Sequence, residues 1–180
     1  MNPISYYLCQ QPVIGTVMWI TTLCSFPPLF SNEPITLLTS DAMISKAFFA
    51  PVSKSYALAI TFEFPSTQAR IEDQVVGTRF DKNCYGTTPY EEIPEAKRLG
   101  LGRQIPFKVT VRNAKNQVIV DEKIYHSLCV TGHMGAKKSQ TIGWLTLKRG
   151  KYTIEVTNLQ AQPDLLNVNT QISLHAGYGK

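Results

Sequence analysis

Hydrophobic and polar residues alternate along most of the chain, and this alternation is typical of β-strands. The pattern is clearest over residues 141–157. There, Tyr152, Ile154 and Val156 are separated by single threonine or glutamate residues, so one face of a strand is apolar and the other polar. Gly150 precedes this strand and can adopt the positive φ of a tight turn. The segment therefore predicts two strands joined as a β-hairpin.

Shorter alternating or apolar runs predict further strands. They lie at residues 35–38, 42–50, 55–64, 105–112, 118–120, 124–130 and 170–178. In the run 124–130, the even-numbered residues, starting with Ile124, are predicted to face the core. Apolar residues around Gly143 are out of phase with their neighbours, which predicts either a strand covered on both faces or a β-bulge.

One helix is predicted, at residues 66–76, with Ser66 as the N-cap and Gly77 as the stop. Ile71 and Val75 lie one turn apart and are expected to dock on a sheet. Residues 78–103 follow no regular pattern. A loop of this length is often functional, and the alternative is a partly ordered surface excursion.

Many short strands with a single helix predict a mainly β fold. We expect a single antiparallel β-sandwich, Ig-like or jelly-roll-like, with one short helix and a long loop. This domain is predicted to occupy residues 33–180.

The first 32 residues contain no Asp, Glu, Lys or Arg, and residues 13–23 form an apolar run. That composition indicates a signal peptide or an N-terminal membrane anchor over residues 1–32. Cleavage is predicted after Ser31, and Cys24 suggests a lipoprotein, although Leu23 departs from the usual small residue before it. The alternative is a buried N-terminal strand or helix of a cytoplasmic protein. We expect a periplasmic or envelope-associated protein.

The net charge is +5, with a sequence pI near 9.0, which suits an anionic partner. No long Lys/Arg run occurs, and aromatic residues are not interleaved with basic ones, so a nucleic-acid partner is not expected. An acidic protein is the expected partner, and membrane association through the N-terminal segment is the other expected contact.

Four groups of residues in the C-terminal half carry a resemblance to a known family. They are Gly102 with Ile105-Pro106-Phe107, Asp121-Glu122 with Tyr125, Ile142-Gly143 with Leu147-x-x-Gly150-x-Tyr152, and Asn158-Leu159 with Pro163-x-Leu165. Together they resemble an uncharacterised proteobacterial family of predicted lipoproteins or secreted β-sandwich proteins, over roughly residues 35–173. The resemblance implies an envelope location and brings no catalytic residues.

Cys84 and Cys129 are the two cysteines of the predicted domain, and in an oxidising compartment they would form a disulfide. Two unpaired thiols are the alternative. A zinc site with His126, Cys129 and His133 is disfavoured, because on a strand His126 and Cys129 point to opposite faces. No signature accompanies a catalytic Cys-His pair. We therefore expect no catalytic residue, no metal and no cofactor.

The preferred hypothesis is a non-enzymatic, periplasmic binding protein, in its most specific form an immunity protein that neutralises a secreted antibacterial toxin. The binding residues are expected on the loop 84–103 and on basic turns that share one rim. They are Tyr85, Tyr90, Lys97, Arg98, Arg103, Lys137, Lys138, Lys148 and Arg149. The alternative is a carbohydrate- or lipid-binding module using exposed aromatics. Those aromatics are Tyr85, Tyr90, Trp144 and Tyr178. A hydrolase working through Cys and His is a third hypothesis.

Overall fold

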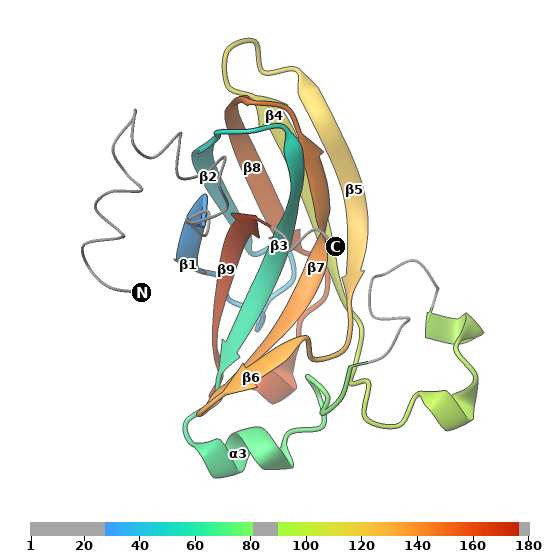
Figure 1. The fold of residues 1–180 in the computed structure, drawn as a ribbon. Coiled ribbons are helices and arrows are strands. Elements are labelled where there is room, and N and C mark those ends of the chain that lie inside the picture. The colour runs from blue at the N-terminus through green and yellow to red at the C-terminus, as the bar shows by residue number, and fades with distance from the viewer. Residues whose placement is uncertain (1–27, 81–89, 177–180) are drawn as a thin grey trace, which may run out of the picture.

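The computed structural model describes residues 28–80 and 90–176, which form two antiparallel sheets packed face to face (Figure 1). The first sheet has the order β1 (Phe30–Pro34), β9 (Asn169–Ala176), β3 (Lys54–Glu63), β7 (Lys137–Leu147) and β6 (Gly132–Met134). The second has the order β2 (Met43–Ala50), β8 (Gly150–Asn158), β4 (Ile105–Asn113) and β5 (Ile119–Ser127). The predicted antiparallel β-sandwich is confirmed.

The core lies between the two sheets and is built from the alternating residues of their strands. Strand β3 contributes Tyr56, Leu58, Ile60 and Phe62, all fully buried. Strands β4 and β8 contribute the facing layer. Its members are Phe107, Val109, Val111, Tyr152, Ile154 and Val156. Burying one such side chain contributes roughly 1.5–3 kcal/mol before conformational entropy is subtracted.

Residues 141–157 form the two predicted strands but not the predicted hairpin. Strand β7 pairs with β3, whereas β8 pairs with β2 and β4 in the other sheet. Lys148 and Arg149 therefore carry the chain from one sheet to the other. Alternation shows which face of a strand is apolar, but it does not show which strand it pairs with, and two facing sheets satisfy the same pattern.

The predicted core face of residues 124–130 is confirmed for Leu128 and Val130, which are buried, but wrong for Ile124 and His126. Strand β5 runs without a break from Ile119 to Ser127, and Ile124 is exposed. Tyr125 points inward instead, and its ring occupies the space above Gly143, where a Cβ atom would lie 2.2 Å from the ring. The register of β7 against β3 shifts beside Gly143, which confirms the predicted bulge.

Helix α3 (Thr67–Glu72) begins where predicted, with the Ser66 hydroxyl accepting a hydrogen bond from the Ala69 N–H. It ends earlier than predicted, because the Asp73 carboxylate accepts hydrogen bonds from the N–H groups that follow. Ile71 is exposed, so its predicted docking on the sheet is also wrong. The short helices η2 (Tyr90–Glu92), η3 (Glu95–Lys97) and η4 (Pro163–Leu165) lie in the connections.

The first edge strand is β1 rather than residues 35–38. Phe30 pairs with Leu174 and packs in the core. The predicted cleavage after Ser31 lies inside β1 and would remove Phe30 from the core. Residues 131–140 lie between two predicted strands, where no strand is predicted, but they contain β6 and the start of β7.

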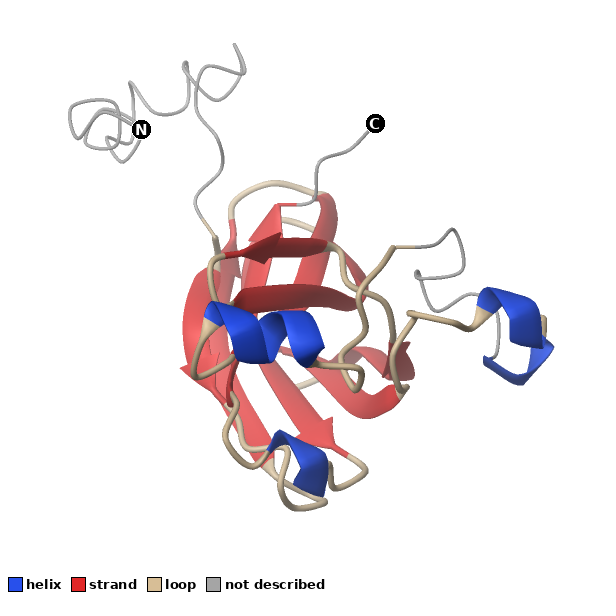
Figure 2. Cartoon of the chain, turned by 90° about the horizontal axis from the view of Figure 1, so that it is seen from below, coloured by secondary structure: helices blue, strands red, loops and turns tan. Residues whose placement is uncertain are grey.

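The strand directions give the sandwich two different ends (Figure 1). We call the end formed by residues 51–53, 114–118 and 148–149 the basic end. The opposite end, here called the loop end, contains α3, residues 73–80 and 90–104, the β6–β7 turn and η4 (Figure 2). Within residues 28–80 and 90–176, no helix is long and apolar enough to cross a membrane.

Candidate binding surfaces at the two ends of the sandwich

The cations predicted to share one rim lie at opposite ends of the molecule. Lys137 begins β7 at the loop end, and Lys148 follows the last residue of β7 at the basic end. At about 3.3 Å per residue, the strand separates these two positions by roughly 35 Å. The single rim is therefore wrong, and two separate surfaces replace it.

Lys138 was predicted to be a surface cation, but it is buried, with 2% of its surface exposed. Its Nζ lies 2.6 Å from Asp73 Oδ2 and also donates to the Asp73 carbonyl at 3.1 Å. The ammonium group lies 5.4 Å from the centre of the Phe64 ring. Because Lys138 occupies an inward position of β7, its charge is desolvated and needs the carboxylate beside it.

Gln140, the next inward residue of β7, extends this buried polar contact. Its Nε2 donates to the Val76 carbonyl at 2.8 Å, and its Oε1 accepts from the Ser127 hydroxyl at 2.7 Å. Beside Val76, the backbone of Gly77 passes so close to that of Leu101 that a Cβ atom would lie 2.6 Å from the carbonyl oxygen. Lys138 and Gln140 thus hold the loops of this end against the sandwich.

Arg98, predicted to contact a partner, braces its own loop. Its Nε donates to the Ile93 carbonyl at 2.7 Å, and its Nη2 donates to the Glu91 carbonyl at 2.8 Å. The guanidinium lies over the Tyr90 ring at 5.0 Å from the centroid. Tyr90 and Arg98 therefore hold η2 and η3 in place, and Tyr85 lies outside the described residues.

Arg79 braces the same loop from the other side. Its Nε donates to the Leu99 carbonyl at 2.7 Å, and its Nη2 donates to the Lys97 carbonyl at 2.6 Å. The Lys97 side chain itself is exposed. Sequence reasoning missed Arg79, because nothing in its own neighbourhood indicates a contact with a segment about twenty residues away.

Two further predicted cations of the loop end are engaged in ion pairs. Arg103 lies 2.8 Å from Asp164, and Lys137 lies 3.2 Å from Glu63. Both pairs are solvent-exposed, where an ion pair contributes about 0–1 kcal/mol. The loop end is therefore mixed in charge rather than uniformly basic.

The loop end presents large apolar side chains to solvent. Leu99 is 84% exposed and Met134 is 80% exposed. Ile71, Phe80 and Leu166 at the same end are exposed as well. Figure 2 looks onto this end, where the helical segments lie around the strand ends, with η2 and η3 out to one side. Leu99 stands on the loop that Arg79 and Arg98 brace, and exposed apolar side chains mark a protein-binding surface where they form a contiguous patch.

The basic end gathers cations from separate connections. Lys115, Lys148, Arg149 and Lys151 are exposed, and none forms an ion pair with another described residue. The connections are fixed to one another, since the Arg149 N–H donates to the Ser53 hydroxyl at 3.1 Å and the Ala114 N–H donates to the Lys151 carbonyl at 3.0 Å. Sequence analysis predicted Lys148 and Arg149 here but could not bring Lys115 beside Lys151.

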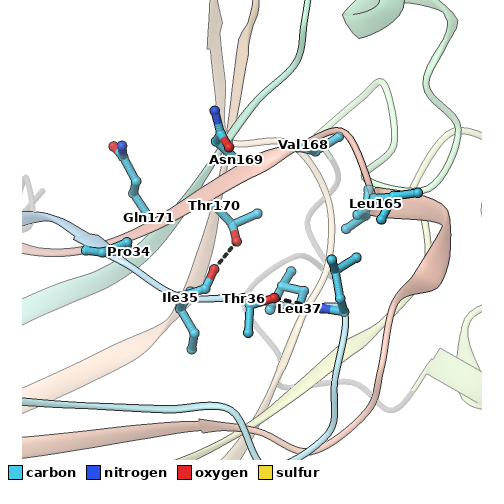
Figure 3. Close-up of a pocket in the computed structure, with 11 residues that line it drawn as sticks. Pro34, Ile35, Thr36, Leu37, Leu165, Val168, Asn169, Thr170 and Gln171 are labelled. Atoms are coloured by element: carbon cyan, nitrogen blue, oxygen red, sulfur yellow. Dashed lines mark hydrogen bonds between the residues drawn. The ribbon is translucent and has the colours of Figure 1, made fainter.

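A groove of about 420 Å³ lies where the end of β1 and the residues after it meet η4 and the start of β9 (Figure 3). The Thr170 hydroxyl donates to the Ile35 carbonyl across it. Pro34, Thr36, Asn169 and Gln171 are among the residues lining it (Figure 3). The two walls lie more than 130 residues apart in sequence, so no local pattern could indicate this groove.

Trp144 lies on the outer face of β7, with 37% of its surface exposed, opposite Ala57 on β3. Tyr178, another aromatic residue named for carbohydrate binding, lies outside the described residues. The hypothesis of a carbohydrate- or lipid-binding module requires an exposed Trp144, and the structure meets this requirement.

Cys129 is fully buried beside Ile93, Leu101 and Leu128. Its φ is 67°, and no cysteine in the described ranges is a free thiol. The predicted partner, Cys84, lies outside those ranges, so the disulfide stays a prediction. His126 and His133 are exposed, and the described residues contain no cluster of three or more His, Cys, Asp or Glu side chains that could hold a metal.

These features define a β-sandwich domain whose two ends carry different surfaces. The chain belongs to the family described as a domain of unknown function, DUF5625, whose model matches residues 32–176. The predicted resemblance to an uncharacterised family is confirmed to this extent, while the proteobacterial and lipoprotein assignments stay predictions.

The chain is also similar to solved structures. One is a crystal structure from Sulfurospirillum deleyianum, with a TM-score of 0.61 and 18% sequence identity, covering 85% of this chain and 99% of that chain. A weaker similarity, with a TM-score of 0.38 and 8% identity, is to a family GH115 4-O-methyl-alpha-glucuronidase with specificity for decorated arabinogalactans, covering 86% of this chain and 18% of that one. No curated protein matches the sequence. The first similarity concerns the fold alone.

Proposed function

We propose that this protein is a non-enzymatic binding protein of the cell envelope that holds a protein partner through its loop end. The observation that carries the proposal is the exposure of Leu99, on a braced loop, and of Met134, at the end of β6, at that end of the sandwich. Arg79 and Arg98 fix the backbone on which Leu99 is presented. A surface that is ordered before binding loses less conformational entropy when the partner docks.

An envelope location is supported by the uncharged N-terminal segment and the apolar run at residues 13–23. In its most specific form, the proposal is an immunity protein that neutralises a secreted antibacterial toxin. The sequence predicted an acidic partner from exposed cations. At the loop end, Arg103, Lys137 and Lys138 are paired with carboxylates of the same chain, which weakens that prediction there. The partner of the loop end is therefore proposed to offer a mainly apolar surface with mixed charge.

Co-purification from the native host tests this proposal with two matched variants. The loop-end variant, Leu99→Ser with Met134→Ser, is expected to lose the partner, with affinity falling by about 30-fold or more if either residue is a hot spot. The control, Phe49→Ser with Val118→Ser, removes exposed apolar side chains elsewhere and should retain the partner. Equal recovery of partner by both variants would reject the loop end as the binding surface.

The immunity form has its own test. The protein is co-expressed with a toxin encoded by the neighbouring gene, and the growth of the host is measured. Wild type should restore growth and the loop-end variant should not, because neutralisation requires the contact. Failure of the wild type to protect against any neighbouring gene product would exclude the immunity form while leaving a protein partner testable.

A second candidate function is carbohydrate binding on the outer face of the five-stranded sheet. The observation that favours it is the position of Trp144, which shares a row with Ala57 and His175 on neighbouring strands. A sugar ring could stack on the indole above this flat row. Binding of glycans that persists in Trp144→Ala would exclude this surface.

A further inference from the structure

The basic end carries one sign of charge throughout. Residues 50–57, 111–120 and 146–153 supply its strand ends and turns, and they contain six Lys or Arg and no Asp or Glu. Arg112 is paired with Glu155 at 3.8 Å, whereas Lys115, Lys148, Arg149 and Lys151 make no ion pair within the described part of the chain. The nearest carboxylates are Glu155, which is paired with Arg112, and Asp121, which follows these segments, so the four unpaired cations leave this end net positive toward an approaching anion.

Exposed apolar side chains lie among these cations. Phe49, 46% exposed, pairs across strands with Lys151, and Val118, 55% exposed, closes the turn that contains Lys115. Ile119 and Val120 follow Val118 and are exposed too. Cations alone would suit any anionic partner, but cations mixed with Phe and Val suit an interface that is anionic on the outside and apolar beneath.

The basic end also contains a shallow hollow bordered by two lysines. A hollow of about 380 Å³ is lined by Asn113, Ala114, Lys115 and Lys151. The Ala114 N–H donates to the Lys151 carbonyl, which fixes the backbone beside the hollow, and Lys115 from the β4–β5 turn and Lys151 from the start of β8 lie at its border. The two lysines can pair with the phosphate of a lipid headgroup.

The chain enters the sandwich from this same side. Strand β1 is antiparallel to β9, which is antiparallel to β3, so β1 and β3 both run away from the basic end. Phe30 is level with Leu58, four residues or roughly 13 Å along β3 from Lys54 at the basic end. Residues 24–29 separate Phe30 from the apolar run at residues 13–23, and a chain of this length reaches at most about 20 Å.

We propose that the basic end docks on an anionic phospholipid surface, with its cations at the headgroups and Phe49 and Val118 entering the boundary below them. This contact is separate from the loop end and does not depend on the proposed protein partner. Each cation near an anionic surface strengthens binding by about fivefold.

Binding of the full chain to vesicles tests this docking. Vesicles of phosphatidylcholine with a minority of phosphatidylglycerol are compared with pure phosphatidylcholine, because the apolar N-terminal segment would bind both alike. Lys148→Glu with Arg149→Glu should weaken the phosphatidylglycerol-dependent binding by about 25-fold or more. Lys97→Glu with Lys108→Glu, exposed cations away from this end, gives the same net charge and should retain it.

The apolar residues separate a membrane from an acidic protein. Phe49→Ser with Val118→Ser should weaken binding to phosphatidylglycerol vesicles by about tenfold and leave any binding to polyglutamate unchanged. The proposal is overturned if wild type binds both kinds of vesicle equally, or if both charge variants lose binding equally. It is also overturned if wild type prefers polyglutamate to the vesicles, which would assign the basic end to an acidic protein.

Discussion

At the residue scale, the buried pair of Lys138 and Asp73 is the contact whose removal should cost most. Their side chains are 3% and 7% exposed, and a charge left alone at such a site is strongly destabilising. Lys138→Met should lower the free energy of unfolding by about 3–5 kcal/mol in a denaturant titration. The exposed neighbour provides the control, since Lys137→Met should cost no more than about 1 kcal/mol.

A double variant shows whether the charge itself is responsible. Asn at position 73 keeps an oxygen that can accept the Val75 N–H but carries no charge. Adding Asp73→Asn to Lys138→Met should therefore restore part of the lost stability. If Lys138→Met costs no more than Lys137→Met, the pair does not hold the loop end.

Tyr125 predicts a pH dependence. Burial, followed by the nearby charge of Asp121, raises the pKa of Tyr125 from 10.0 to about 12. The folded chain therefore holds this proton more tightly than the unfolded chain does. The stabilisation is complete below pH 10.0 and is lost as pH rises toward 12.

Denaturant titrations across that pH window measure the effect. Wild type should lose stability steadily, and Tyr125→Phe should lose less of it over the same range. Some dependence should remain, because burial also raises the pKa of Tyr56. The same pH dependence in both proteins would contradict the assignment to Tyr125.

At the element scale, the sequence predicted the strands far better than their partners. Alternation located β3, β4, β8 and β9, because each has one face against the core. It failed where a core position is polar or small. The start of β7 lacks the apolar alternation of a strand, because its inward residues are Lys138 and Gln140. The inward face of β5 was not predicted, because Tyr125 packs over a residue without a side chain, Gly143.

The candidate surfaces were predictable only in part, because the sequence indicates which residues are exposed but not which segments lie side by side. Lys148 and Arg149 stand in a turn and are exposed, as the sequence indicates. Arg98 donates to the carbonyl of Ile93 instead of facing solvent, and no pattern of residue spacing in the sequence indicates this contact. Lys115 lies at the same end because β4 pairs with β8, which places Asn113 opposite Tyr152, and no local pattern in the sequence indicates that pairing.

The loop element also carries the predicted disulfide between Cys84 and Cys129. Peptide mapping of unreduced protein should recover these two cysteines in one linked fragment. Cys84→Ala should lower the free energy of unfolding by about 2–4 kcal/mol, and adding Cys129→Ala should cost only the further loss of packing. Recovery of Cys84 in an unlinked, alkylated peptide would contradict the pairing.

At the scale of the whole molecule, we propose that the two ends of the sandwich have separate binding tasks. The rigid sandwich keeps the loop end and the basic end roughly 35 Å apart, so a change at one end leaves the contacts of the other unaltered. A partner held at the loop end and a membrane at the basic end could be bound together.

The most direct test is the affinity of the purified captured partner for three proteins: wild type, Leu99→Ser with Met134→Ser, and Phe49→Ser with Val118→Ser. Wild type and the basic-end pair should bind the partner equally. The loop-end pair should bind about 30-fold more weakly or worse. The account is contradicted if the loop-end pair binds as wild type does, or if the basic-end pair is the one that loses the partner.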